Sequence, residues 1–216
     1  MTDVWSRRAD AFRTSVVHRE GPDLDLLVEW CEPGEGVRAL DVATGGGHVA
    51  RRLRDAGCEV VTVDPAPGMQ PTVVARAEDI PFADESFDVV ACRIAAHHFA
   101  NVRAAVHEMA RVTRNLVVVE DNVFVSDAVE AAERLRDPTH VRCYTEEEWR
   151  TFFAEAGLRV EAERDFDRRA DVEDWLARVD TPDADALRVR ELLGDRIQDG
   201  QLLLRSAVFK TRKASA

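Results

Sequence analysis

A glycine-rich turn between two acidic residues is the first feature of the sequence whose residue types and spacing can do chemistry. Asp41 ends an apolar run, and three consecutive glycines, Gly45, Gly46 and Gly47, begin four residues later. A second apolar run ends in Asp64. Glycines at the start of a helix let a ligand lie against the backbone, and a carboxylate after the next strand can accept both hydroxyls of a ribose. The pattern indicates a nucleoside site, with a tight turn and a turn cap as structural alternatives.

Three kinds of ligand compete for such a turn. A dinucleotide favours G-x-G-x-x-G, which fails here because the sixth position from Gly45 is Ala50. A phosphate-binding loop needs G-K-[ST], which is absent from this turn. The third pattern is D-x-x-x-G-x-G, in which the aspartate lies inside the strand. The aspartate suits a cationic group, and the glycines suit a neutral nucleoside. A ligand with an ammonium, a sulfonium and no phosphate therefore fits this turn.

Composition and charge limit the partners of the chain. Its 216 residues carry a net charge of −12, and nucleic-acid binding without sequence preference needs a basic face. We therefore expect no nucleic acid and no membrane surface as partners. The first residues, MTDVWSRRADAF, contain no apolar signal region, so we expect a cytoplasmic protein. The four cysteines form no C-x-x-C pair, and we expect neither a disulfide framework nor a metal.

Strands and helices alternate along the chain in the order typical of a parallel sheet. The expected strands are the apolar runs at 37–43, 58–64, 72–77, 87–93 and 115–121, and two alternating runs at 158–166 and 201–210. The expected helices cover 6–17, 48–57, 101–114, 127–137, 172–179 and 184–196, with one beginning at Asp23 as a cap and one at Thr145 in a capping box with Glu148. This order predicts an α/β fold with a Rossmann-like, doubly wound, mostly parallel sheet, an antiparallel edge and helices on both faces.

The chain is expected to form a single domain over residues 1–216. Within it, 1–35 would form N-terminal helices or a lid, 36–122 the ligand-binding half, and 123–216 the substrate-side helices and the closing strand pair. Residues 65–72 are expected to form a loop, because Pro65, Pro67, Gly68 and Pro71 do not suit a helix interior.

Six motifs follow one another in order between residues 37 and 122. They are LDVATGGG, VTVDPAPGM, RAEDIPF, SFDVVACRIAAHHF, HEMARV and LVVVED. They resemble the motifs of class I S-adenosylmethionine-dependent methyltransferases of the ubiquinone and menaquinone biosynthesis type, in a small-molecule branch of that group. The resemblance implies a seven-stranded sheet with S-adenosylmethionine across the ends of the first, second and fourth strands.

The resemblance also implies which residues bind this cofactor. Asp41 and the loop from Ala43 to Gly47 would line its methionine part and ribose, Asp64 would take the ribose hydroxyls, and Met69 would pack on the adenine. Ala77 and Glu78 would edge the adenine, and Arg93 would lie near the methionine end. The implied cofactor-binding residues are Asp41, Ala43, Thr44, Gly45, Gly47, Asp64, Pro65, Met69, Arg76, Ala77, Glu78 and Arg93.

The chain departs from the pattern of this family in two places that affect the adenine side. The family often has Asp or Asn where this chain has Arg76. Only twelve residues separate Asp64 from Ala77, where the family places a helix and a strand. One wall of the adenine pocket is therefore expected to be thinner.

Paired histidines are the candidate catalytic residues. Methyl transfer relies on positioning, and a general base is needed only if the acceptor must lose a proton. His97 and His98 follow the fourth strand, and we slightly favour His97 as the base. The structural alternative is that one ring packs inward and the other bonds a helix end.

Other polar residues give weaker hypotheses. Substrate binding is assigned to Asp121, His140 and Arg142, and a salt-bridged loop with Arg136 is the alternative for the last two. His18 and Phe12 are expected in an N-terminal lid, and His48 and His107 at the surface or at helix caps.

The favoured function is an S-adenosylmethionine-dependent methyltransferase, an enzyme acting on a small-molecule acceptor. A methyltransferase-like protein that binds the cofactor without catalysis is one alternative. A nicotinamide-dependent oxidoreductase is another, against which the missing third glycine of G-x-G-x-x-G counts. A homodimer is left open.

Overall fold

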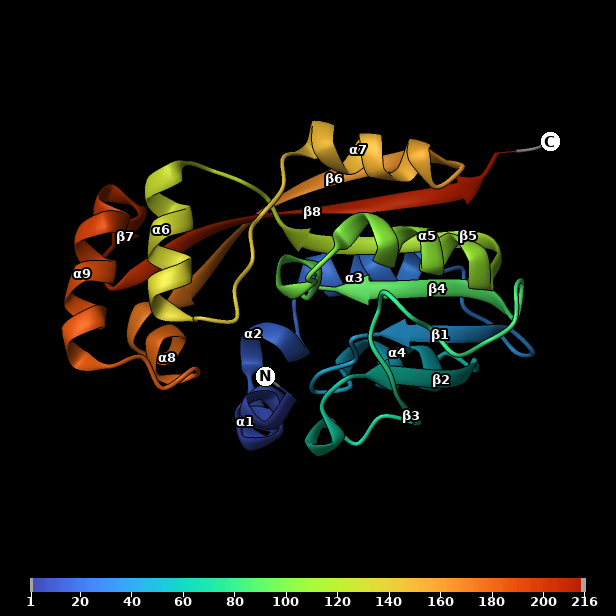
Figure 1. The fold of residues 1–216 in the computed structure, drawn as a ribbon, viewed down its shortest axis with the longest axis horizontal. Helices are drawn as coiled ribbons and strands as arrows, with labels where there is room; N and C mark the ends of the chain where they lie inside the picture. Colours follow the sequence, from blue (N-terminus) through green and yellow to red (C-terminus); the bar gives the residue numbers. More distant parts are fainter. Residues whose placement is uncertain (1, 215–216) are drawn as a thin grey trace.

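A mostly parallel sheet forms the centre of the computed structural model, which describes residues 2–214 (Figure 1). Its strands are β1 (Arg38–Val42), β2 (Glu59–Asp64), β3 (Val73–Val74), β4 (Phe87–Arg93), β5 (Thr113–Asn122), β6 (Leu158–Asp171), β7 (Ile197–Gln198) and β8 (Gln201–Lys213). They follow the order β3-β2-β1-β4-β5-β8-β6, with β7 paired to β8. The first five strands are parallel, whereas β8 runs antiparallel to β5 and β6. The predicted fold class is confirmed, and β7 is an eighth strand beyond the seven that the family resemblance implied.

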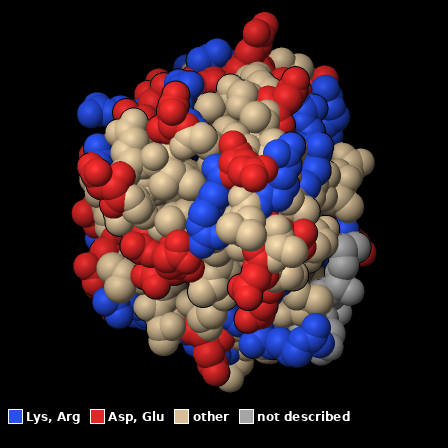
Figure 2. Space-filling view, turned by 90° about the vertical axis from the view of Figure 1, so that its left-hand side faces the viewer, with Lys and Arg blue, Asp and Glu red and all other residues tan. Residues whose placement is uncertain are grey.

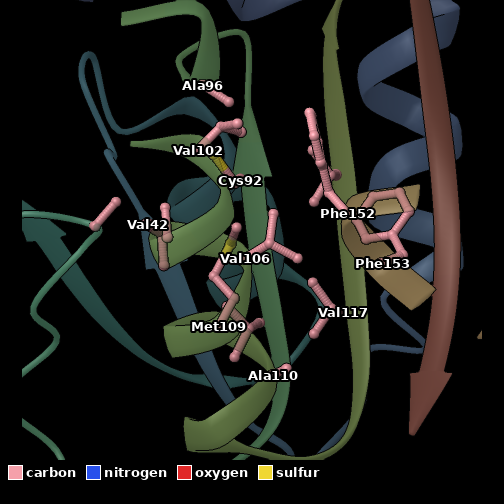
Figure 3. Close-up of a cluster of buried hydrophobic side chains, with 14 of the residues drawn as sticks. Val42, Cys92, Ala96, Val102, Val106, Met109, Ala110, Val117, Phe152 and Phe153 are labelled. Carbon is pink, nitrogen blue, oxygen red and sulfur yellow. The ribbon is translucent and has the colours of Figure 1, made fainter. Parts of the chain in front are cut away.

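Helices cover both faces of this sheet, as predicted. They are α1 (Thr2–Thr14), α2 (Val16–Arg19), α3 (Pro22–Trp30), α4 (His48–Asp55), α5 (Val102–Val112), α6 (Asp127–Arg136), α7 (Glu146–Glu155), α8 (Val172–Ala177) and α9 (Asp183–Leu193). On one face, α5 and α7 bury Met109 and Phe153 against the strands, and Figure 3 shows this layer. On the other face, α3 and α4 bury Leu27 and Leu53. The alternating arrangement leaves the carboxyl ends of β1, β2 and β4 free to carry a site.

The last two long strands reach past the sheet and carry a separate layer of helices. β6 has 14 residues and β8 has 13, so both are longer than the runs at 158–166 and 201–210 predict. Their far halves pack against α6, α8 and α9 around Trp175, Leu176 and Val189, on the left of Figure 1. Figure 2 shows that acidic and basic side chains are interspersed on this side of the molecule. That face offers no single basic surface of the kind that nucleic acid requires.

The segment between β2 and β3 is the shortened crossover seen in the sequence. Its only regular element is a 3₁₀ turn, η1 (Pro67–Met69). The prediction of a loop over residues 65–72 is therefore confirmed. The capping box at the start of α7 is confirmed as well, because the Thr145 hydroxyl accepts the N–H of Glu148 and the Glu148 carboxylate accepts the N–H of Thr145.

Two local predictions near the N-terminus are wrong. The single helix predicted over 6–17 is broken at Ser15, which has an extended conformation between α1 and α2. Asp23 does not cap α3, because Gly21 holds the cap position and the Asp23 side chain is buried within the protein. None of the described helices combines the length and the apolar character that a membrane span requires.

Candidate active site

A cavity of about 220 Å³ lies at the carboxyl ends of β1, β2 and β4, under α1. The loops that follow these strands form one wall, and residues of α1 and of the segment after β4 form the other. All the residues assigned to the cofactor by the family resemblance line this cavity, except Gly47. The polar residues that follow separate strands are therefore brought to one place, as the sheet order requires.

The glycine-rich loop is held by Asp41 at the end of β1. The buried Asp41 carboxylate accepts the hydroxyl of Thr44 at 2.5 Å and the N–H of Ala50 at 3.2 Å. Burial raises the pKa of Asp41 to about 6. Gly45 and Gly47 have φ angles of 50° and 73°, in the left-handed region that favours glycine. The Asp41 carboxylate thus fixes the turn through these two hydrogen bonds, so it is not free to bind a ligand with all of its lone pairs.

Asp64 joins this loop to the crossover after β2. One of its carboxylate oxygens accepts the N–H of Gly45 at 3.0 Å, and the other accepts the N–H of Ala66 at 2.9 Å. Burial raises the pKa of the Asp64 carboxyl, and the two N–H groups partly oppose that rise. Asp64 lines the cavity, and each of its oxygens retains a second lone pair that can accept a hydrogen bond. A vicinal diol is a ligand that this carboxylate can hold.

Arg76 and Glu78 form the thin outer wall of the cavity. The Arg76 guanidinium pairs with Glu78 at 3.2 Å, and its side chain is 58% exposed. The same carboxylate oxygen of Glu78 accepts the N–H of Asn101. Met69 and Ala77 are buried beside them. The wall is built from side chains on a loop, because the crossover helix usual in the family is missing.

Arg93 lines the cavity, but its nitrogens are engaged by the protein itself. Its guanidinium donates to Glu120 at 2.6 Å, to Asp23 at 2.5 Å and to the carbonyl of His18 at 2.9 Å. Both carboxylates are buried, and burial raises the pKa of Glu120 to about 7. Arg93 therefore ties α2 and α3 to β4 and β5, and presents little free donor capacity to a ligand.

The two candidate catalytic histidines lie on η2 (Ala96–His98) and face different surroundings. His98 lines the cavity, whereas His97 does not and packs behind it, with the ring centroids 4.1 Å apart. One oxygen of the Asp121 carboxylate lies 2.6 Å from the ring nitrogen Nδ1 of His97, and the other accepts the backbone N–H of His97 at 2.7 Å. Burial lowers the pKa of His97, but the charge and hydrogen bond of Asp121, together with the charge of Glu133, raise it, and the net change is upward.

His98 is held in one tautomer by the loop after α6. Its Nδ1 lies 3.1 Å from the carbonyl of Thr139, to which only a protonated nitrogen can donate. Burial and the neighbouring His97 hold the pKa of His98 well below its ordinary value. The ring is therefore neutral near pH 7, with a lone pair on Nε2. A neutral imidazole with a free lone pair is the state that a general base requires.

The residues assigned to substrate binding do not line the cavity. Asp121 bonds to His97, His140 pairs with Glu130 at 3.2 Å, and Arg142 pairs with Glu148 at 3.0 Å. Their neighbours Thr139 and Val141 line the cavity instead. The salt-bridged alternative describes this segment, because Arg136 also pairs with Glu133 and donates to a backbone carbonyl. Glu130, His140 and Cys143 bring potential ligand atoms within 4.8 Å of one another, but Glu130 already accepts from the other two.

Sequence reasoning missed part of the cavity wall. Trp5 of α1 lines it beside His98, with ring centroids 4.7 Å apart. Phe12 and His18, which were expected in a lid, line it as well. His48 was expected at the surface or at a helix cap. The first alternative is wrong because its side chain is buried and lines the cavity, whereas its Nε2 bonds the carbonyl of Phe12 in the last turn of α1, as a helix-capping group does. The spacing of Trp5 and Phe12, two turns apart on one helix face, was the available signal.

The fold and this site define a class I methyltransferase, a class whose cofactor is S-adenosylmethionine. A family model described as a methyltransferase domain matches residues 40–118. The uncharacterized methyltransferase YcgJ of Bacillus subtilis is 31% identical over 200 residues, which cover 82% of this chain and 79% of that protein. The chain therefore belongs to the methyltransferase family and is an S-adenosylmethionine-dependent enzyme. The nicotinamide-dependent alternative is set aside.

Solved structures and further relatives agree with this family. The crystal structure of YcgJ has a TM-score of 0.82 at 26% identity, and the match covers 90% of this chain and 99% of that one. A putative methyltransferase from Bacillus halodurans has a TM-score of 0.80 at 27% identity, covering 90% and 100%. A demethylmenaquinone methyltransferase of Mycobacterium sp. (strain KMS) is 36% identical over 134 residues, which are 56% of this chain and 57% of that protein.

Proposed function

We propose that the enzyme methylates a small organic acceptor that lies between α1 and the carboxyl end of β4. One observation carries this proposal: a single cavity joins the wall of Asp64 and the glycine-rich loop to the wall of Trp5, Phe12 and His98. The first wall suits a nucleoside and the second suits an apolar or aromatic molecule. When bound, S-adenosylmethionine supplies an electrophilic methyl group on its sulfonium.

The cofactor residues form a continuous surface in this proposal. Asp64 would accept the ribose hydroxyls, since it lines the cavity and both of its oxygens are held in fixed positions by backbone N–H groups. Met69 and Ala77 would cover the adenine, with Glu78 at its edge. Arg76 would close that edge through its ion pair with Glu78 rather than through a direct bond. Arg93 would act by holding the surrounding segments, because its own donors are used.

His98 is the favoured general base if the acceptor must lose a proton. The hydrogen bond to Thr139 fixes its tautomer and leaves Nε2 free to take a proton. His97, the residue that the sequence slightly favoured, is held by Asp121 behind His98 and does not line the cavity. It would orient η2, and Asp121, His140 and Arg142 would act on the acceptor only through the loop that they order.

The acceptor screen should begin with phenols and quinols. The apolar and aromatic wall around His98 suits a ring, and a relative is named as a demethylmenaquinone methyltransferase. The division of the domain at residues 35 and 122, a homodimer and a cytoplasmic location are further proposals, which rest on the sequence alone.

Calorimetric titration tests the function directly. We expect S-adenosylmethionine and S-adenosylhomocysteine to bind one per chain and NAD not to bind. Transfer of a labelled methyl group to one member of the acceptor panel would then identify the acceptor. Absence of binding by both S-adenosyl compounds would overturn the proposal.

A further inference from the structure

The backbone conformation of Gly46 does not explain why this position is glycine. Its two neighbours have positive φ angles, and Gly46 does not. A Cβ atom at Gly46 would lie 2.7 Å from the carbonyl oxygen of Phe12 and 3.0 Å from its carbonyl carbon. The same Cβ would lie 2.7 Å from Nε2 of His48. The space beside Gly46 is therefore occupied by α1 of the same chain.

Gly68 in η1 repeats this arrangement at the other cofactor loop. A Cβ atom there would lie 2.5 Å from the Cα of Ser6 and 2.7 Å from its carbonyl oxygen. The N–H of Gly68 donates to the Ser6 hydroxyl at 3.0 Å, and Arg13 donates to the Gly68 carbonyl. Figure 1 shows α1 beside this turn. Backbone of α1 thus meets backbone of both loops, and at each contact a side chain larger than hydrogen would collide.

His48 supplies a polar contact at the same junction. Its Nε2 lies 2.9 Å from the carbonyl oxygen of Phe12 and donates to it. That carbonyl is in the last turn of α1, where its one backbone partner is the N–H of Ser15 at 3.4 Å. Burial lowers the pKa of His48, and its Nδ1 is buried without a partner, so the ring is neutral with its proton on Nε2.

We propose that Gly46, Gly68 and His48 are positioning residues that seat α1 on the two cofactor loops. The seated helix places Trp5 and Phe12 in the cavity wall, with Trp5 against His98. The roof over the acceptor is therefore located by the loops that would hold the cofactor. That last consequence rests on the proposed function, whereas the seating of α1 does not.

Limited trypsin digestion of the full chain measures how often α1 leaves its seat. Cleavage after Arg8 and Arg13 requires the helix to open, and its rate follows the open population when reclosing is fast. We expect Gly46→Ala and Gly68→Ala to raise this rate more than tenfold, because backbone atoms cannot move aside. His48→Ala removes one hydrogen bond and should raise the rate about fivefold. His48→Gln keeps an N–H donor at the Nε2 position and should restore the wild-type rate.

Gly34→Ala is the matched control, since a Cβ at Gly34 would meet nothing closer than Val37 at 4.0 Å. It should be cut at the wild-type rate. If Gly46→Ala and His48→Ala are also cut at that rate, the proposal is overturned. Should a glycine variant fail to fold, the contrast between His48→Ala and His48→Gln decides, and equal rates for these two refute the role of His48. Titration of the wild type with S-adenosylhomocysteine tests the proposed function separately, because the digestion result does not depend on it.

Discussion

Replacing Asp64 by alanine tests where the cofactor binds. In the folded protein this carboxylate already orders two loops, through the N–H groups of Gly45 and Ala66 at 3.0 and 2.9 Å. In the proposed complex it would accept the two ribose hydroxyls as well. Asp64→Ala therefore removes direct contacts and also loosens the surface around them.

The magnitude follows from the number and kind of these bonds. A hydrogen bond to a charged group contributes about 1.5–3 kcal/mol, and two bonds to one carboxylate are not fully additive. We expect a loss of about 2–4 kcal/mol in binding free energy, which is about a 30-fold to 900-fold rise in Kd. Burial raises the pKa of Asp64, so this carboxylate becomes protonated at a higher pH than an ordinary aspartate. As the pH is lowered, the affinity of the wild type for the cofactor should therefore begin to fall earlier than it would with an ordinary aspartate.

Isothermal titration with S-adenosylhomocysteine at pH 7.5 is the assay, with circular dichroism to show that the variant is folded. Asp55→Ala, an exposed aspartate at the far end of α4, is the control and should leave Kd unchanged. Asp64→Asn keeps the size of the side chain but turns an amide donor toward one of the loop N–H groups, so it should also bind weakly. A folded Asp64→Ala variant with Kd within threefold of wild type would refute the placement of the ribose.

Three further predictions concern buried charge, a helix cap and the base. Arg93→Met removes the cation that Asp23 and Glu120 share and leaves only Arg168, 3.4 Å from Asp23, so it should cost about 3 kcal/mol and lower the Tm by about 6–12 °C. The loss should be greater at pH 8 than at pH 5.5, because the pKa of Glu120 is about 7 and only the charged form needs the cation; equal losses would contradict this. Thr145→Ala removes the capping box and should lower the free energy of unfolding in urea by about 1 kcal/mol. His98→Ala should lower kcat by about 10²–10⁴ on an acceptor that must lose a proton, and wild-type activity should persist below pH 6.5, because burial lowers the pKa of His98; an unchanged kcat would exclude this base.

The alternation of strands and helices and part of the cofactor wall could be predicted because both depend on short stretches of sequence, whereas the order of the strands in the sheet was not predicted. A strand, a glycine turn and a helix are local patterns, and the carboxyl ends of neighbouring parallel strands must meet at one edge. Asp41 and Asp64 were therefore placed together without knowledge of any contact, whereas Glu78 was assigned through the family resemblance. The length of β6 was underestimated because its far half, which carries the α6, α8 and α9 layer, is rich in charged residues and departs from the alternating pattern. β8 was underestimated by its last three residues, which pair with β5 and with the start of β6.

The direction of a polar side chain at the sheet edge could not be predicted in the same way. Arg93, Asp121 and His140 all come from segments that border the cavity, yet each is directed to another protein group. The partner of Arg93 at Asp23 is 70 residues away in the sequence. Position along a strand fixes which edge a residue reaches, but long-range partners decide whether its charge remains available to a ligand.

The three consecutive glycines include two that a local pattern explains and one that only a long-range contact explains. Gly45 and Gly47 adopt left-handed conformations, and a turn between a strand and a helix demands such residues locally, so the sequence pattern alone indicates them. Gly46 lacks that local reason, and a Cβ there would meet the backbone of Phe12, 34 positions earlier in the chain. A run of glycines indicates that something approaches the backbone closely, but it does not show whether that neighbour is a ligand or another helix. The collision distances show that the docking of α1 is by itself a sufficient reason for the middle glycine, which also lines the cavity.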